Sequence, residues 1–523
     1  MKHARIFVNK LIRHPLSYLI FLYFFIHLIN LTAMPIFNDE SIYLDWAWSS
    51  THIPGQLFDS LLDAKQPLMI WVFALFENVI PDPLFAGRFA SVLIGALTLI
   101  GIFSVTEMLV HRKAAVVASL LYMAIPLFVY YNRQALMESA VACVGMWSFY
   151  ALTHLIREPR MKHGAILGAI LGVGFFIKSS TVLFIVPSAL MILFYALKRK
   201  APLAKPVLVA VGVFLCITLA LFFNPDFWKT LHTNSRYSFT LAELVRFPIA
   251  AWMHQLLGLL EIALIYITPL VFLSAVVGSV RMVKHNVRHS ALFLVFFTVA
   301  LCLEVLLGKV QGQRYVVAFL PFLVIPASFF IVHLWKKGIG QRLVVGAVFV
   351  LPVMLTAVLV FHFDSYFTQL AKISRYADLH NIRGQTSGYG IQDAIGYIKD
   401  HTDSATPVIL MIALNTGNPE NAVNLYSRPE NNLFVVHGSA TFFPEIAKIE
   451  CLTSVYPTFF ITRNAELSGL ERYFRLEKAF VNPDGVTSVG VYSLQTACEG
   501  ASGSLSDFYA PAMEKIRQIK GLQ

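Results

Sequence analysis

The chain has little charge, and this scarcity excludes an ordinary soluble protein. Asp, Glu, Lys and Arg make up only 14% of its 523 residues, while hydrophobic residues make up 57%. Soluble domains usually carry about 25% charged residues. Because so few charged side chains cannot cover the surface with polar groups, most of the chain must contact lipid. The sequence therefore predicts an integral membrane protein.

Cysteine and metal-binding motifs are also scarce. The chain has five cysteines, and no CxxC pair or His-rich spacing indicates a zinc site. Cys143, Cys216 and Cys302 fall in apolar runs, where a thiol packs as a small hydrophobic group. Cys451 and Cys498 lie in the polar C-terminal part, so a disulfide between them stays an open alternative.

The net formal charge of +11 does not indicate a nucleic-acid partner. Lys and Arg occur in short clusters between the apolar runs rather than along one polar face. Such clusters are typical of the ends of membrane spans. Nucleic acid is therefore excluded as a partner, and membrane lipids are expected instead.

Long apolar runs alternate with short polar segments over the first 362 residues. Runs long enough to cross a bilayer occur at about 15–34, 85–110, 114–131, 134–156, 163–177, 180–197, 206–223, 255–281, 290–308, 315–335 and 341–362. The run Pro67–Ile80 is too short to cross and is expected to lie at the interface. The fold class predicted is a polytopic α-helical membrane protein with about eleven spans.

The distribution of Lys and Arg predicts the orientation. With the N-terminus in the cytoplasm, the cytoplasmic segments hold roughly twice as many Lys and Arg as the opposite loops, as the positive-inside rule requires. An odd number of spans then places the C-terminal part on the extracytoplasmic face. The absence of obvious eukaryotic features favours a bacterial inner membrane.

The composition changes from about residue 364, where Gly, Asn, Asp and Pro become frequent. β-rich runs at 407–414, 432–438, 457–463 and 486–494 accompany helical patterns at 391–400 and around 442–452. The sequence predicts a membrane domain, 1–362, with an extracytoplasmic loop at 35–84. It also predicts a small extracytoplasmic α/β domain, 363–523, with an accessory or docking role.

Charged residues gather in the loops expected on the extracytoplasmic face. Asp39 and Glu40 follow the first run directly, and the alternative interpretation of this pair is a helix cap with a first-turn acid. The other residues of this face are Lys65, Arg133, Glu138, Lys178, Glu304, Lys309, Arg314 and Tyr315. Each basic residue alone is typical of an interface anchor. Their joint placement beside an acidic pair predicts a shared site.

The order of these motifs resembles the GT-C glycosyltransferases of the protein O-mannosyltransferase and aminoarabinose-transferase superfamily. The motifs are the Asp-Glu pair, K-x-P-L-x-x-W at 65–71, A-G-R-F-A-S at 86–91, R-x-A-L-x-E at 133–138, Lys178, and R-Y at 314–315. The chain departs from the family in having Ala64 where Glu is frequent, and Glu138 where Asp is usual. The first departure concerns acceptor or metal handling, and the second keeps the charge on a longer arm.

The resemblance implies transfer of a sugar from a polyprenyl-phosphate donor to a glycan, lipid or protein acceptor, with inversion. Lys65, Arg133, Lys178 and Arg314 are then expected to bind the donor's phosphate. Asp39 is expected to be the base.

The acidic side chains besides Asp39 have supporting roles in this interpretation. Glu40 completes the catalytic pair, and it and Glu138 orient the cations or the acceptor. Glu304 and Tyr315 belong to the substrate-binding set, with Glu304 expected to pair with Lys309 or Arg314.

No cofactor is predicted with certainty, although a divalent metal at the acidic pair stays open. Two other functions also stay open. A transporter or flippase of a lipid-linked sugar usually shows internal repeats and charges at the bilayer midplane, which the sequence lacks. A non-catalytic homologue that binds a polyprenyl lipid is the other alternative.

Overall fold

The computed structural model describes residues 14–199, 203–336, 338–377, 382–384, 386–413, 416–438, 456–463 and 474–494. The chain divides into two compact units. We call them the helical unit (Met1–Leu31, Phe58–Val72 and Arg88–Asp378) and the sheet unit (Thr32–Leu57, Phe73–Gly87 and Leu379–Gln523). The sheet unit thus joins parts of the segment 32–87 to the C-terminal part. The division into domains at 362/363 stays a prediction.

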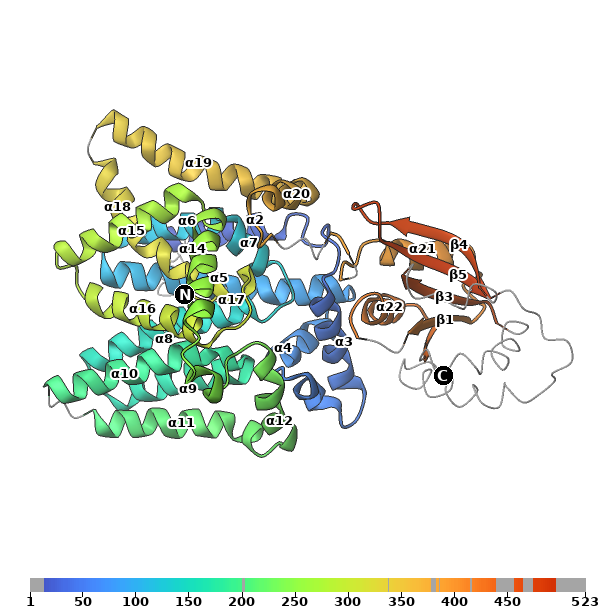
Figure 1. The fold of residues 1–523 in the computed structure, drawn as a ribbon, viewed down its shortest axis with the longest axis horizontal. Coiled ribbons are helices and arrows are strands. Elements are labelled where there is room, and N and C mark those ends of the chain that lie inside the picture. The colour runs from blue at the N-terminus through green and yellow to red at the C-terminus, as the bar shows by residue number, and fades with distance from the viewer. Residues whose placement is uncertain are drawn as a thin grey trace, which may run out of the picture. The chain divides into compact units, whose positions relative to one another are not determined.

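The first half of the helical unit follows the predicted apolar runs (Figure 1). Its helices are α2 (Pro15–Leu28), η1 (Gln56–Asp63), α4 (Leu68–Glu77), α5 (Pro83–Leu109), α6 (Arg112–Ala124), α7 (Pro126–Asn132), α8 (Glu138–Arg157), α9 (Met161–Ile177), η2 (Ser179–Thr181), α10 (Val182–Arg199) and α11 (Ala204–Phe222).

The second half of this unit contains shorter connecting helices as well as long apolar ones. They are α12 (Pro225–Thr233), η3 (Asn234–Arg236), α13 (Leu241–Leu244), α14 (Ile249–Tyr266), α15 (Pro269–Lys284), α16 (Ser290–Leu307), α17 (Gln313–Val316), η4 (Leu320–Leu323), α18 (Val324–Trp335), α19 (Ile339–Phe361) and α20 (Phe363–Ile373).

The predicted integral membrane protein is confirmed. Within the described residues, seven helices are long and apolar enough to cross a membrane, and the pair α6 and α7, bent by 71°, would form an eighth span. Four shorter apolar helices, among them α2 and α9, also occur in this part of the chain. The number of eleven spans stays a prediction.

Three predicted spans are not single helices: 114–131 is divided between α6 and α7, 315–335 is divided among α17, η4 and α18, and the third is 255–281. The run 255–281 is not one helix but two, α14 and α15, which are separated at Ile267 and Thr268. Thr268 has a φ of +70° and Pro269 begins α15. Because proline has no amide hydrogen, it cannot continue the hydrogen bonding of the preceding helix. Because the apolar composition continues across this break, the length of the run does not reveal it.

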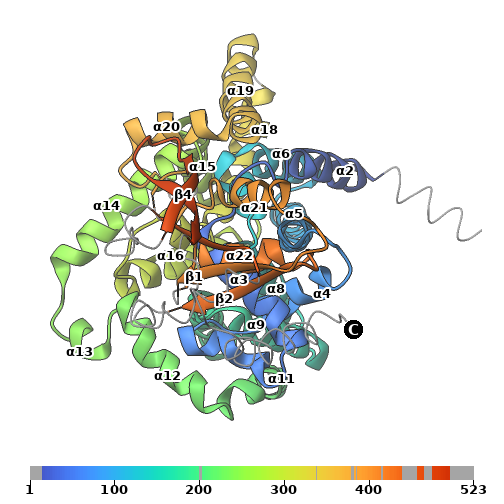
Figure 2. The ribbon, with the colours of Figure 1, turned by 90° about the vertical axis from the view of Figure 1, so that its right-hand side faces the viewer.

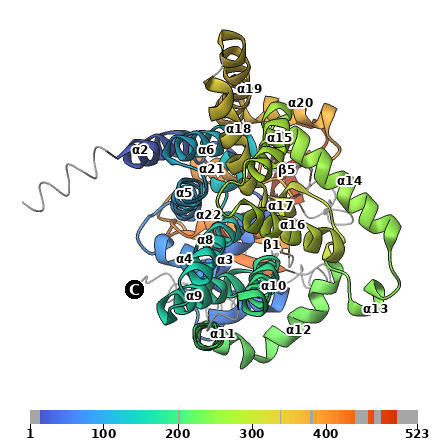
Figure 3. The same ribbon diagram turned by 90° about the vertical axis from the view of Figure 1, so that its left-hand side faces the viewer.

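Helices α9 and α11 pack closely, as Figure 1 shows along their length and Figure 3 shows from another side. A Cβ atom on Gly164 would lie 2.0 Å from the carbonyl oxygen of Pro206, and one on Gly168 would lie 2.1 Å from that of Ala210. Only glycine permits this approach of two backbones. Small residues four apart are a common contact between membrane helices.

The sheet unit combines α3 (Asn38–His52) with the C-terminal elements (Figure 2). These are α21 (Ile391–Asp400), β1 (Val408–Ala413), α22 (Glu420–Ser427), β2 (Leu433–Gly438), β3 (Thr458–Arg463), β4 (Phe474–Val481) and β5 (Ser488–Leu494). The described strands form one sheet in the order β2-β1-β3-β5-β4. Strand β1 is parallel to both β2 and β3, whereas β5 is antiparallel to β3 and β4.

The predicted small α/β region is confirmed in most of its elements. The four β-rich runs are strands β1, β2, β3 and β5, and the pattern at 391–400 is α21. The prediction missed β4 and α22. The helix expected around 442–452 lies outside the described residues, as do Cys451 and Cys498.

Candidate active site

Three of the predicted site residues meet inside the helical unit. Glu138 begins α8, Lys178 follows the last residue of α9, and Arg314 lies in the short helix α17. One carboxylate oxygen, Oε1 of Glu138, accepts from Lys178 Nζ at 2.8 Å and from Arg314 Nε at 2.7 Å. Glu138 is 2% exposed, and Arg314 is 176 residues away from it in the sequence. We call these three residues the ion cluster.

The local sequence explains how each side chain reaches the cluster. Each one lies at a helix end or in a short helix, where the chain changes direction. The bend between α6 and α7 falls at Pro126, and α8 begins a few residues after α7 ends. Glycine at 312 precedes α17 with an extended backbone. These turns place charged groups where a continuous membrane helix would carry apolar ones.

The ion cluster carries more positive than negative charge. Glu138 opposes both Lys178 and Arg314, and the charge of Lys65 also acts on Lys178. Glu138 Oε2 makes no hydrogen bond within the described residues. Lys65 lies 3.8 Å from Asp63 and 5.5 Å from the ring centre of Tyr237. A surplus of cations with one shared carboxylate can bind an anion such as a phosphate.

Arg133 is directed to the backbone. Its Nη2 donates to the carbonyl oxygens of Ile29 and Asn30, both at 2.7 Å, and Arg133 is 6% exposed. Nearby, Arg88 Nη1 donates to the carbonyl of Leu31 at 2.9 Å. The two arginines therefore hydrogen-bond to the carbonyl groups of the three residues that follow α2. Binding of the donor's phosphate by Arg133 stays a prediction.

The burial of Arg88 was not predicted from the sequence, in which this residue was noted only as part of the motif A-G-R-F-A-S. It is completely buried in α5, a helix with the length and composition of a membrane span. A charged residue inside such a helix is costly unless its charge has partners. The position of Arg88 within the apolar run 85–110 was the available signal.

Glu304 and Tyr315 line a narrow pocket in the helical unit. Gln255 and Gln311 supply further polar groups, and apolar residues of α14 and α16 complete its wall. The charge of Lys178 acts on Glu304. The pocket therefore lies in the field of the ion cluster and holds a carboxyl, two amides and a phenol that could contact a polar ligand.

The predicted pairing of Glu304 with Lys309 is wrong. Lys309 pairs instead with Glu243, at 2.8 Å, and donates to the carbonyl of Ser235 at 2.8 Å. Hydrogen bonds from Lys309 and Thr240 lower the pKa of the Glu243 carboxyl to about 2. Lys309 therefore fastens the segment after α12 to the segment after α16.

Asp39 and Glu40 lie in the sheet unit, in the first turn of α3. The buried Glu40 accepts from the backbone N–H of Phe37 at 3.0 Å, as a helix-capping acid does. Asp39 is half-buried, and Tyr43 Oη approaches its Oδ2 at 3.5 Å. The alternative of a first-turn acid thus describes the contact of Glu40. The catalytic assignment of both residues stays a prediction.

A metal site does not emerge from the described part of the chain. Its residues contain no group of three or more His, Cys, Asp or Glu side chains arranged to hold a metal ion. The three described cysteines, Cys143, Cys216 and Cys302, are free thiols.

Comparisons with known proteins give a family match for one segment and a fold for most of the chain. Residues 64–223 match the family described as dolichyl-phosphate-mannose-protein mannosyltransferase. This segment includes Lys65, Arg133, Glu138 and Lys178. No curated protein sequence matches the chain.

Solved structures match over most of the chain. ArnT from Cupriavidus metallidurans bound to undecaprenyl phosphate has a TM-score of 0.54 and 13% identity, over 91% of this chain and 97% of that one. Its apo state gives a TM-score of 0.53 and 14% identity, over 94% and 98%. The Archaeoglobus fulgidus oligosaccharyltransferase with zinc and sulfate gives 0.51 and 11%, over 91% and 72%.

The fold is that of the GT-C class of membrane glycosyltransferases. Residues 64–223 resemble the mannosyltransferase family, and the fold over most of the chain is similar to that of ArnT. The resemblance seen in the motif order is therefore confirmed.

Proposed function

We propose that the chain transfers a sugar from a polyprenyl-phosphate donor to an acceptor on the extracytoplasmic face of a bacterial inner membrane. The observation that carries this proposal is the ion cluster, in which Glu138 holds Lys178 and Arg314 together. The acceptor is a glycan, a lipid or a protein. The GT-C fold and the matched family segment support the same reaction class.

The cations stabilise the leaving phosphate. When the bond between the sugar and the phosphate breaks, negative charge develops on the phosphate oxygens. Lys178 and Arg314, assisted by Lys65, are preorganised donors for that charge, and such donors act strongly where water is excluded. Glu138 keeps the two cations close together, since one carboxylate oxygen accepts from both.

The acceptor must lose a proton as it attacks the sugar. A carboxylate that is partly removed from water can take that proton, and Asp39 is half-buried. Attack from the face opposite the leaving phosphate inverts the anomeric carbon and needs one base. The proton passes to Asp39, the acceptor oxygen or nitrogen bonds to the sugar carbon, and the electron pair of the broken bond leaves with the phosphate.

A transfer assay tests this function. The purified chain in lipid nanodiscs is supplied with a panel of radiolabelled polyprenyl-phosphate sugars and with extracts of cell-envelope glycolipid and protein. We expect transfer from at least one donor, and a loss of roughly 100-fold for Lys178→Ala, the magnitude typical of removing one charge-stabilising donor. Lys229→Ala is the matched control, because Lys229 is exposed and pairs only locally with Asp226.

Either of two results would overturn the proposal. One is equal rates for the Lys178 and Lys229 variants. The other is a wild-type chain that moves lipid-linked sugar between leaflets without transferring it. If transfer is observed, mass spectrometry of glycoconjugates from a deletion strain identifies the acceptor.

A further inference from the structure

The first turn of α3 is held by the segment that precedes α22. The backbone N–H of Asn418 donates to Asn38 Oδ1 at 2.8 Å. The side-chain amide of Asn418 donates to the carbonyls of Ile36 and Thr386, at 3.1 and 3.0 Å. Asn418 is 7% exposed. One buried asparagine therefore ties together the residues directly before Asp39 and the C-terminal part of the sheet unit.

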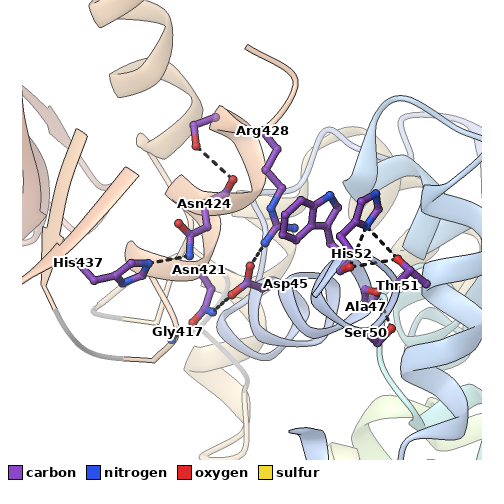
Figure 4. A network of polar contacts seen from close by, with 12 residues as sticks. Asp45, Ala47, Ser50, Thr51, His52, Gly417, Asn421, Asn424, Arg428 and His437 are labelled. Carbon is purple, nitrogen blue, oxygen red and sulfur yellow. Dashed lines mark hydrogen bonds and ion pairs between the residues drawn. The ribbon is translucent and has the colours of Figure 1, made fainter. Parts of the chain in front are cut away.

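A second attachment lies further along α3, at Asp45 (Figure 4). Asn421 Nδ2 donates to Asp45 Oδ2 at 2.6 Å, and the guanidinium of Arg428 pairs with Asp45 Oδ1. The same guanidinium lies 4.2 Å from the ring centre of Trp48. The two donors lie at opposite ends of α22: Asn421 is in its first turn, and Arg428 directly follows its last residue.

The two attachments share one face of α3. Asn38 and Asp45 are seven residues apart, which is about two helical turns, so their side chains lie on the same side. Asp39 is offset from this face by about 100°. Attachment at two points along the axis restricts both the translation and the rotation of α3. The direction of Asp39 is thereby set while its carboxylate stays off the attached face.

Packing alone does not explain why charged side chains, rather than apolar ones, form this contact. The side chains of Arg428 and Asp45 are only 16% and 14% exposed, so both charges are largely desolvated. An apolar pair of similar volume would be about as stable or more stable. A directional polar contact does fix the register and orientation of two elements better than an apolar one. A constraint on the orientation of α3 is the consequence that fits both observations.

We propose that Asn418, Asn421 and Arg428 are positioning residues for Asp39, through which the C-terminal part of the sheet unit aligns the base for the reaction. This inference rests on the proposed function. It assigns the C-terminal part a role in catalysis that does not require it to contact the donor or the acceptor.

Kinetics of an Arg428→Met variant test the catalytic half of the inference. We expect kcat to fall at least about tenfold, because small misplacements of a catalytic group are costly. The KM for the donor should stay within about twofold, since the ion cluster is unchanged. The reversed pair Asp45→Arg with Arg428→Asp should recover part of the lost kcat. Arg475→Met is the control, because Arg475 is 65% exposed and pairs within β4 with Glu477.

Hydrogen exchange tests the positioning half without any assay of transfer. The amides of residues 37–46 should exchange faster in Arg428→Met than in wild type, whereas those of Arg475→Met should not change. Unchanged exchange in Arg428→Met overturns the inference. So does a kcat no lower than that of Arg475→Met, or an equal change in kcat and KM. If the wild-type chain itself shows no transfer, that result contradicts the proposed function instead.

Discussion

At the scale of single residues, Glu138 is a buried carboxylate shared by two cations. It is almost completely buried, and a single oxygen faces both Lys178 and Arg314. Removing one member of a buried ionic group leaves the others without compensation, at a cost of about 3–5 kcal/mol. A charge-preserving change should therefore be tolerated far better than a neutral one.

Two substitutions of Glu138 test whether its negative charge is required. Glu138→Gln keeps the shape and removes the charge, so Lys178 and Arg314 repel each other, and we expect transfer to fall about 100-fold or more. Glu138→Asp keeps the charge on a shorter arm and should lose less than about tenfold. Initial rates at saturating donor check this, with Glu107→Gln as the control, since Glu107 pairs with Arg112 at the exposed end of α5. Equal losses in the Gln and Asp variants would show that the charge is not what matters.

At the scale of elements, the contact of α9 with α11 depends on glycine. We expect Gly168→Ala to destabilise the protein, because its Cβ would meet the Ala210 carbonyl at 2.1 Å and the backbones would have to separate. Gly212→Ala in α11 is the matched control. No atom lies within 4 Å of its added Cβ, so it should be neutral or stabilising by up to about 1 kcal/mol. Thermal denaturation in detergent measures both, and a similar Tm for the two variants would contradict the packing argument.

The turn between β4 and β5 should respond to acid. Burial raises the pKa of Asp484, but hydrogen bonds from Thr487, Val486 and Gly384 outweigh it and lower the pKa to about 2. A carboxyl with a depressed folded-state pKa adds stability above its ordinary pKa, and this stability is lost as the pH falls toward 2. Because Asp484 is only half-buried, screening by solvent keeps the effect below about 1 kcal/mol.

Amide exchange at Gly384 and Thr487 checks this prediction. After correction for intrinsic exchange rates, protection in wild type should decline between pH 4 and pH 2. Asp484→Asn should show lower protection that changes little over the same interval. Protection in wild type that is constant with pH would contradict the assignment.

The same elements show what sequence reasoning reached and what it did not. Apolar run length and β-rich composition are local properties, so most helices and four strands could be predicted from them. Strand β4 was missed because Arg475, Glu477 and Lys478 interrupt its apolar residues, as charged side chains often do in an edge strand. The break before Pro269 was overlooked because the apolar run continues through it.

The candidate site, too, could be predicted from the sequence only in part. Motif order predicted a shared site of charged residues, but the hydrogen bond between Glu138 and Arg314 joins residues 176 apart. Only the packed helices determine such a contact. The ion pair between Asp45 and Arg428 could likewise not be predicted from the sequence, since no motif links the two residues.

At the scale of the whole molecule, the orientation in the membrane remains to be measured. The positive-inside rule predicts that Arg475 is extracytoplasmic and Lys162 cytoplasmic. In a background with the native cysteines replaced, Arg475→Cys should react with an impermeant maleimide in intact spheroplasts. Lys162→Cys should react only after the membrane is permeabilised. The opposite labelling pattern would reverse the topology and place the proposed reaction on the wrong face.

The central claim is that the ion cluster binds the phosphate of a polyprenyl lipid. Native mass spectrometry of the purified chain with undecaprenyl phosphate measures this directly, without knowledge of the sugar or the acceptor. Wild type should bind one lipid, Lys178→Ala should bind at least about tenfold more weakly, and Lys229→Ala should bind as wild type does. Equal affinity in all three proteins would contradict the account.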